Sequence, residues 1–175
     1  IEVSSIYELK DALKFANKII SSGPAKTIDY LELSIDNGAI ISVDDLEELK
    51  KIREINKFTK VFLRINDVID NVTSRFGINI SQINECLRII KNSKIEIIGF
   101  SFHINNYNLD DRIYAIRKII KLSEKYDIKI KYIDIGGGFP SNYCNKENYE
   151  RFLKQVNSNM FFKHKKFNDF YTYYS

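Results

Sequence analysis

The sequence predicts a parallel α/β fold in one main domain. Apolar segments of strand length alternate with segments of helical period at least four times, which is typical of strand–helix–strand units with right-handed crossovers. Two of these strands end in polar or glycine residues, the groups that bind ligands at the carboxyl ends of parallel strands. The length of 175 residues allows one domain with a real core. The alternation alone leaves open whether the sheet is open or closed into a (β/α) barrel.

The segments that we expect to form strands are short, rich in β-branched residues and bounded by turn signals. The clearest covers residues 128–135, where apolar and aromatic residues surround one acid and three glycines follow directly. Another begins at Ile95 and ends at His103. In chain order, the expected strands lie at residues 1–3, 19–20, 39–43, 61–65, 95–103 and 128–135.

The segments that we expect to form helices combine capping residues with apolar positions three or four residues apart. Ser4 or Ser5 can cap the first helix, with Glu8 as a capping-box partner, and this helix should run to about Lys18. Later helices should begin near residues 27, 45, 80, 110 and 146. We expect the domain to span residues 1–156, and the tail at residues 157–175 to be irregular or truncated because it lacks clear periodicity.

Composition and charge are those of an ordinary globular protein and argue against several classes of function. Hydrophobic residues make up 44% and charged residues 29% of the chain, and the net charge is +4. This mild charge does not favour a nucleic-acid partner, and no apolar run is long enough to span a membrane. With two cysteines and no visible signal peptide, we expect a reducing, cytoplasmic compartment. The chain starts at Ile1 rather than Met, so we expect that an N-terminal segment is missing.

Three consecutive glycines, Gly136, Gly137 and Gly138, follow the strand at residues 128–135. Without Cβ atoms they can take positive φ and aim several N–H groups at one point, which is how backbone binds a phosphate. The stretch does not match the dinucleotide fingerprint, because Ser141 stands where its last glycine would be. A tight loop after a strand is the simpler interpretation of the glycines alone.

The strand before His103 favours a binding site over a simple tight loop, because this strand ends in residues that can bind a ligand. His103 is followed by Asn105 and Asn106, and the carboxyl ends of parallel strands share one edge of the sheet. We therefore expect His103 and the three glycines to open on one face and line one pocket. The alternative for His103 is a packed, hydrogen-bonded histidine of the core. We expect no metal site.

Six motifs follow one another along the chain: EVSSIYEL at 2–9, SGPAKT at 22–27, FLRIN at 62–66, SRFGI at 74–78, GFSFH at 99–103 and IDIGGGFP at 133–140. Their order and spacing resemble those of the pyridoxal-phosphate-dependent ornithine/diaminopimelate/arginine decarboxylases, the fold-type III enzymes that share a barrel with alanine racemase. The likeness covers roughly residues 1–156 and implies a (β/α)8 TIM-type barrel, incomplete in this chain, with about six strands.

The resemblance also implies roles for particular residues around pyridoxal 5'-phosphate. The three glycines would bind the phosphate, and His103 would stack on the pyridine ring. Arg64 resembles a family arginine near the cofactor that pairs with an acid on an early strand, and Glu2 occupies the position of that acid. Asn106 stands where the family has a small residue whose hydroxyl helps to hold the phosphate. For Arg75 in the SRFGI motif, a structural role in the loop is expected at least as much as a chemical role.

The resemblance implies decarboxylation of an amino acid by a longer parent enzyme. It also implies that this parent enzyme is a homodimer. Racemisation of an amino acid is the near alternative, and a non-catalytic, truncated phosphate-binding remnant is the alternative from another class. The Schiff-base lysine of the family lies before the segment matched by Ile1, so the catalytic residue is expected outside this chain. Lys26 could be proposed as a substitute, but we expect it to be a solvated residue at a helix start.

Overall fold

The computed structural model describes residues 1–70, 74–106, 108–137 and 145–158. The chain divides into two compact units, the first made of residues 1–104 and 108–136 and the second of residues 105–107 and 137–175. The first unit contains the six strands and five α-helices. The second contains helix α6 (Lys146–Ser158).

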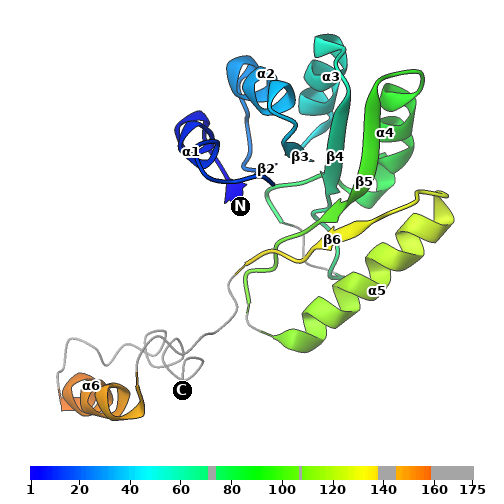
Figure 1. Ribbon diagram of the computed structural model, residues 1–175. Helices are drawn as coiled ribbons and strands as arrows, with labels where there is room; N and C mark the ends of the chain where they lie inside the picture. Colours follow the sequence, from blue (N-terminus) through cyan, green and yellow to red (C-terminus); the bar gives the residue numbers. More distant parts are fainter. Residues whose placement is uncertain (71–73, 107, 138–144, 159–175) are drawn as a thin grey trace. The chain divides into compact units, whose positions relative to one another are not determined.

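The first unit is built on one sheet of six parallel strands, whose order in the sheet is their order in the chain. Figure 1 shows the helices α1 to α5 along the outer side of this curled sheet. The arrangement confirms the predicted α/β fold and corresponds to an incomplete TIM-type barrel. The strands are β1 (Glu2–Val3), β2 (Ile20–Ser21), β3 (Ile40–Val43), β4 (Thr59–Arg64), β5 (Ile95–Ser101) and β6 (Tyr132–Asp134).

The helices begin where side-chain caps fix their first turns. Ser5 accepts a hydrogen bond from the amide of Glu8, and Asp45 accepts one from the amide of Glu48. In the part of the chain that the structure describes, no helix is both long enough and apolar enough to cross a membrane. The helices of the first unit are α1 (Ile6–Ala12), α2 (Ile28–Asp36), α3 (Leu46–Ile55), the 3₁₀ turn η1 (Ile80–Gln82), α4 (Ile83–Ile90) and α5 (Leu109–Lys125).

Helix α1 is shorter than predicted, because the chain after it is already drawn toward the sheet. The helix ends at Ala12 and not at Lys18. The carbonyl of Lys18 accepts a hydrogen bond of 2.8 Å from the amino group of Ile1, and Ile20 pairs with Glu2 in the sheet. These long-range contacts override the local helical pattern of the sequence.

Strand β6 is shorter and more exposed than the buried strand predicted over residues 128–135. It pairs with β5 alone and forms one edge of the sheet, and Tyr132 is 56% exposed. Ile128 and Ile130 pack against the core without joining the sheet. The apolar run therefore combines a core contact with an edge strand, a distinction that β-branched composition does not reveal.

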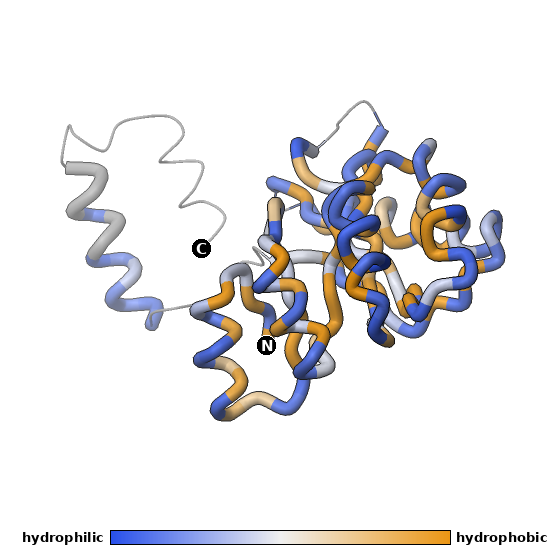
Figure 2. The backbone as a smooth tube through the Cα atoms, turned by 90° about the horizontal axis from the view of Figure 1, so that it is seen from above, coloured by the Kyte–Doolittle hydropathy of each residue, from blue (hydrophilic) through white to orange (hydrophobic). Residues whose placement is uncertain are grey.

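The main hydrophobic core lies between the sheet and helices α2 to α5. Figure 2 shows apolar positions interleaved with polar ones along these helices, as expected for helices with one buried face. A close approach of β5 and β6 borders this core at Gly99. A Cβ built on Gly99 would lie 2.1 Å from the carbonyl oxygen of Tyr132 and 3.0 Å from the ring of Phe62, so only glycine fits.

Candidate functional site

Polar side chains from neighbouring strands meet at the carboxyl end of the sheet in the first unit. Arg64, Ser101 and Asp134 are aligned across β4, β5 and β6. The hydroxyl of Ser101 lies 2.8 Å from that of Ser42 on β3, and both side chains are buried. This contact reaches across β4, so the two serines lie on the concave, inner face of the sheet. The carboxyl end of the strands is where a barrel binds its ligands.

His103 and Gly136 lie next to each other just after β5 and β6, as the sequence predicts, whereas the expectation that they line one pocket stays a prediction. A Cβ built on Gly136 would lie 2.8 Å from Nδ1 of His103 and 2.8 Å from the carbonyl oxygen of Phe102. The φ angle of Gly136 is +71°, in the left-handed region that favours glycine. The backbone beside them is joined by a 3.0 Å hydrogen bond from the Phe102 amide to the Asp134 carbonyl. The two strand ends are thus packed against each other, with no room for a larger residue.

The amide of Gly136 is already used within the protein. It donates a 2.9 Å hydrogen bond to Oδ1 of Asp134, two residues earlier, which is the pattern of an Asx turn. Gly136 therefore allows close approach to His103, and its predicted contact with a phosphate stays a prediction. Gly137 and Asn106 belong to the second unit, and Gly138 lies outside the described residues, so their predicted phosphate contacts stay predictions.

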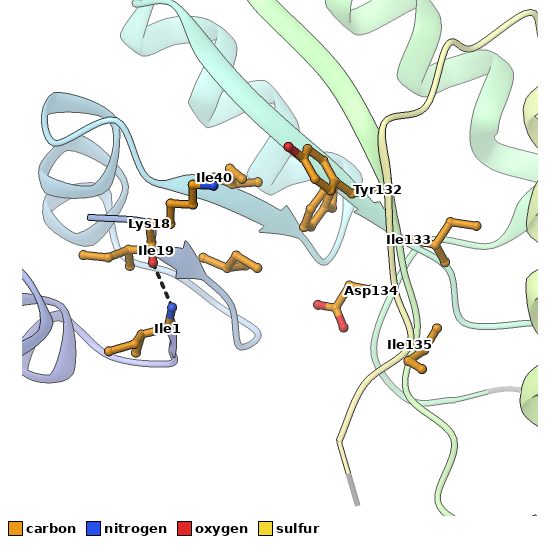
Figure 3. A pocket seen from close by; sticks show the side chains of 10 residues that line it. Ile1, Lys18, Ile19, Ile40, Tyr132, Ile133, Asp134 and Ile135 are labelled. Carbon is orange, nitrogen blue, oxygen red and sulfur yellow. Dashed lines mark hydrogen bonds between the residues drawn. The ribbon is translucent and has the colours of Figure 1, made fainter. Parts of the chain in front are cut away.

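Asp134 is a site residue that the sequence reasoning missed. Figure 3 shows its side chain pointing into a cavity of about 430 Å³ on the inner side of the first unit. The detectable signal was an acid two residues before a glycine at a strand end, which is the spacing of an Asx turn. The cavity is otherwise mostly apolar, and its lining includes Ile1, Ile19, Ile20, Ile40, Phe62, Tyr132, Ile133 and Ile135.

Arg64 is paired with Asp44, and the predicted pairing with Glu2 is wrong. Nη1 of Arg64 donates a 2.8 Å hydrogen bond to Oδ1 of Asp44, and the two side chains are 17% and 5% exposed. Asp44 directly follows β3, the strand next to that of Arg64, whereas β1 with Glu2 is separated from β4 by two strands. The acid on the neighbouring strand therefore reaches the guanidinium.

The loop that carries the SRFGI motif packs on the end of β4. The amide of Ile78 donates a 2.7 Å hydrogen bond to the carbonyl of Arg64. The guanidinium carbons of Arg64 and Arg75 lie 5.5 Å and 5.4 Å from the centroid of the Phe76 ring. Both distances fall within the range of a cation–π contact, so Phe76 contacts two cations, one of them at the site.

Lys26 is buried in an ion pair, and the prediction that it is solvated is wrong. Its Nζ lies 2.8 Å from Oε1 of Glu48 and donates hydrogen bonds of 2.7 Å to the carbonyls of Gly23 and Ser42. The side chains of Lys26 and Glu48 are 1% and 3% exposed. Burial raises the pKa of the Glu48 carboxyl, and the charge of Lys26 opposes that rise. The amine is held by three acceptors, so it is poorly suited to act as a nucleophile.

Comparison with known proteins gives a consistent result along most of the chain. Residues 1–169 match the family model described as pyridoxal-dependent decarboxylase, pyridoxal binding domain. A decarboxylase of 2-[(L-alanin-3-ylcarbamoyl)methyl]-2-hydroxybutanedioate from Staphylococcus aureus is 30% identical over 84% of this chain. Antizyme inhibitor 2 from Mus musculus is 28% identical over 82% of the chain.

Solved structures give the same fold. The crystal structure of arginine decarboxylase from Paramecium bursaria Chlorella virus, bound to agmatine, matches 82% of the chain with a TM-score of 0.71 and 29% sequence identity. The chain spans 42% of the Staphylococcus aureus relative, 33% of the mouse relative and 42% of the viral structure. The likeness therefore concerns less than half of each of these proteins.

Proposed function

This chain belongs to the family of pyridoxal-dependent decarboxylases, in the part that forms their pyridoxal-binding domain, and from this we propose that the protein decarboxylates an amino acid with pyridoxal 5'-phosphate as its cofactor. The observation that carries the proposal is the contact between His103 and Gly136 at the ends of β5 and β6. In this contact an aromatic ring lies beside the start of the glycine-rich loop.

The residues at this edge fit such a cofactor. A phosphate needs a backbone segment rich in glycine, and Gly136, where any Cβ would clash with His103, brings the start of the glycine-rich loop against the imidazole. A planar ring needs a flat partner, which the imidazole of His103 provides. Arg64, held by Asp44, adds a fixed positive charge for an anionic ligand.

We assign each of these residues a role in holding the cofactor and substrate. His103 would stack on the pyridine ring, and Gly137, Gly138 and Asn106 would donate N–H groups to the phosphate. Asp134 keeps the turn at Gly136 in place through its 2.9 Å hydrogen bond. When bound, pyridoxal phosphate supplies the electron sink that makes loss of carbon dioxide from an amino acid feasible.

Lys26 is not the catalytic amine of this proposal. The buried ion pair of Lys26 supports this assignment, because its ammonium group is held by Glu48 and two carbonyl oxygens. A lysine nucleophile needs an amine that is free to approach its electrophile. An amine fixed among these acceptors does not meet that need.

A second candidate function is a binding protein that keeps the pyridoxal-binding domain without a decarboxylase reaction. The observation that favours it is the match to antizyme inhibitor 2, which is named for inhibition and not for a reaction. Catalysis by the protein at its native length distinguishes the two candidates.

The test is to titrate the protein at its native length with pyridoxal phosphate, follow the visible absorbance of the cofactor, and then measure carbon dioxide release from a panel of amino acids. Gly136→Ala should weaken cofactor binding by about tenfold or more, because the new methyl group meets His103. Gly38→Ala is the matched control: its φ of +68° carries the same backbone strain, but nothing lies within 4 Å of the added Cβ.

Equal cofactor affinity in the two glycine variants would show that Gly136 is not at the binding site. Tight cofactor binding without carbon dioxide release from any amino acid would favour the binding protein. Release of carbon dioxide with formation of the matching amine would establish the decarboxylase.

A further inference from the structure

We infer that Phe76 is a positioning residue: its ring fixes the orientation of the Arg64 guanidinium at the carboxyl end of β4, and through Arg64 it strengthens the binding of an anionic ligand. The identity of that ligand, pyridoxal phosphate, rests on the proposed function. The part of the inference that concerns Arg64 does not, because it follows from the contacts of the protein alone.

Arg64 is held from two directions that together determine where its remaining N–H groups point. Asp44 accepts a hydrogen bond of 2.8 Å from Nη1, at the edge of the guanidinium. The centroid of the Phe76 ring lies 5.5 Å from the guanidinium carbon. A ring contact uses no donor, and a guanidinium carries five N–H groups, so donors remain for an anion.

Phe76 can hold Arg64 because its own loop is tied to β4. The φ angle of Gly77 is +106°, and a Cβ there would lie 2.9 Å from the carbonyl oxygen of Arg64. The amide of Ile78 donates to that same carbonyl at 2.7 Å, and the amide of Phe76 donates to Oγ of Ser74 at 3.2 Å. The backbone of Gly77 and Ile78 contacts the carbonyl of Arg64, and this holds the Phe76 ring next to the Arg64 side chain.

Burial alone does not explain an aromatic residue at this position. Phe76 is 38% exposed, so a large part of its ring faces solvent and gains nothing from the core. What its ring does contact is charged, with Arg64 at 5.5 Å and Arg75 at 5.4 Å. This predicts that the aromatic face of residue 76 matters more than its apolar volume.

The experiment compares three variants of the protein at its native length. Phe76→Leu keeps an apolar side chain but removes the ring, and Phe76→Tyr keeps the ring. Phe58→Leu is the matched control, because Phe58 is 62% exposed and its ring lies 6.0 Å from Nζ of Lys60, another residue of β4. The same kind of contact is thus removed away from Arg64.

The first measurement is the Nε–H resonance of Arg64 by NMR without cofactor, identified by its loss in Arg64→Lys. In Phe76→Leu this signal should move toward that of a mobile, solvent-exposed arginine. Phe76→Tyr and Phe58→Leu should leave it in place. An unchanged signal in Phe76→Leu, or a Phe76→Tyr variant that behaves like Phe76→Leu, would overturn the inference.

The second measurement is the affinity for pyridoxal phosphate. Phe76→Leu should bind it about two- to fivefold more weakly, which is the effect expected for loss of one partly exposed cation–π contact. Phe76→Tyr should restore the affinity, and Phe58→Leu should not change it. If the unmodified protein fails to bind the cofactor, the proposed function falls, and the Arg64 signal still decides the role of Phe76. Unchanged affinity in Phe76→Leu would overturn the link to the ligand.

Discussion

At the scale of single residues, the ion pair of Lys26 and Glu48 is the most buried of those among the described residues. Its ammonium group joins the carbonyl of Gly23, after β2, to that of Ser42 in β3, and to a carboxylate of α3. The pair thus holds together three elements at the edge of the sheet where the site lies. Removing one partner of such a buried ion pair is strongly destabilising, because the remaining charge stays buried without its counter-ion.

We expect Lys26→Met to lower the free energy of unfolding by about 3–5 kcal/mol at neutral pH, since it leaves Glu48 buried without its cation. The double variant Lys26→Met/Glu48→Leu should recover much of this loss, because both charges are then removed together. Urea denaturation of the single and double variants measures both values. A double variant as unstable as the sum of its single variants would contradict the pairing.

The same ion pair predicts that the stability of the Lys26→Met variant depends on pH. Burial raises the pKa of Glu48 above its ordinary value, and removing Lys26 takes away the main influence that lowers it. Because the folded protein then holds this proton more tightly than the unfolded chain, stability contributed by the protonated carboxyl is present at low pH and lost as pH rises through the folded pKa. The destabilisation of Lys26→Met should therefore shrink as the solution is made more acidic.

The sequence was enough to predict that His103 and Gly136 lie together at the carboxyl end of the sheet, but not which acids pair with Arg64 and Lys26. His103 and Gly136 could be paired in advance, because each directly follows its own strand and parallel strands end at one edge. The partners of Arg64 and Lys26 were not identified. Asp44 directly follows β3, and Glu48 lies in the first turn of α3, and several acids near these positions could have been the partner.

At the scale of elements, β6 is held on β5 through a position that tolerates only glycine. We expect Gly99→Ala to lower the free energy of unfolding by about 3 kcal/mol or more, because its methyl group would lie 2.1 Å from the Tyr132 carbonyl oxygen. Adding Phe62→Leu should relieve the 3.0 Å ring contact but not the backbone contact. Thermal unfolding of both variants measures the loss of stability. A Gly99→Ala variant as stable as the native protein would contradict the close approach of β5 and β6.

The elements that could be predicted are those set by local signals. Ser5 and Asp45 cap α1 and α3 through hydrogen bonds within one turn, so the sequence alone indicates them. The end of α1 and the length of β6 depend on which strands lie alongside. The contact between Ile1 and Lys18 joins residues seventeen positions apart, and no local pattern encodes it.

At the scale of the whole first unit, the chain order of the strands explains both the fold and its open sides. Periodicity predicted a parallel sheet without deciding between an open sheet and a barrel, and the sequential order of all six strands is that of a barrel wall. The wall has two edges, β1 and β6. Its concave side holds the cavity of about 430 Å³ that is lined mainly by isoleucine and aromatic side chains.

We expect the 175-residue chain, produced by itself, to associate as its concentration rises. Strands β1 and β6 present unpaired backbone groups, and edges of this kind pair with those of other molecules. The apolar lining of the cavity, with Ile1 at 56% and Tyr132 at 56% exposure, adds a hydrophobic surface that favours the same outcome. Sedimentation velocity across a concentration series, with a dye that reports exposed apolar surface, measures both effects. A chain that stays monomeric and binds no dye would show that these edges and this cavity are protected in solution.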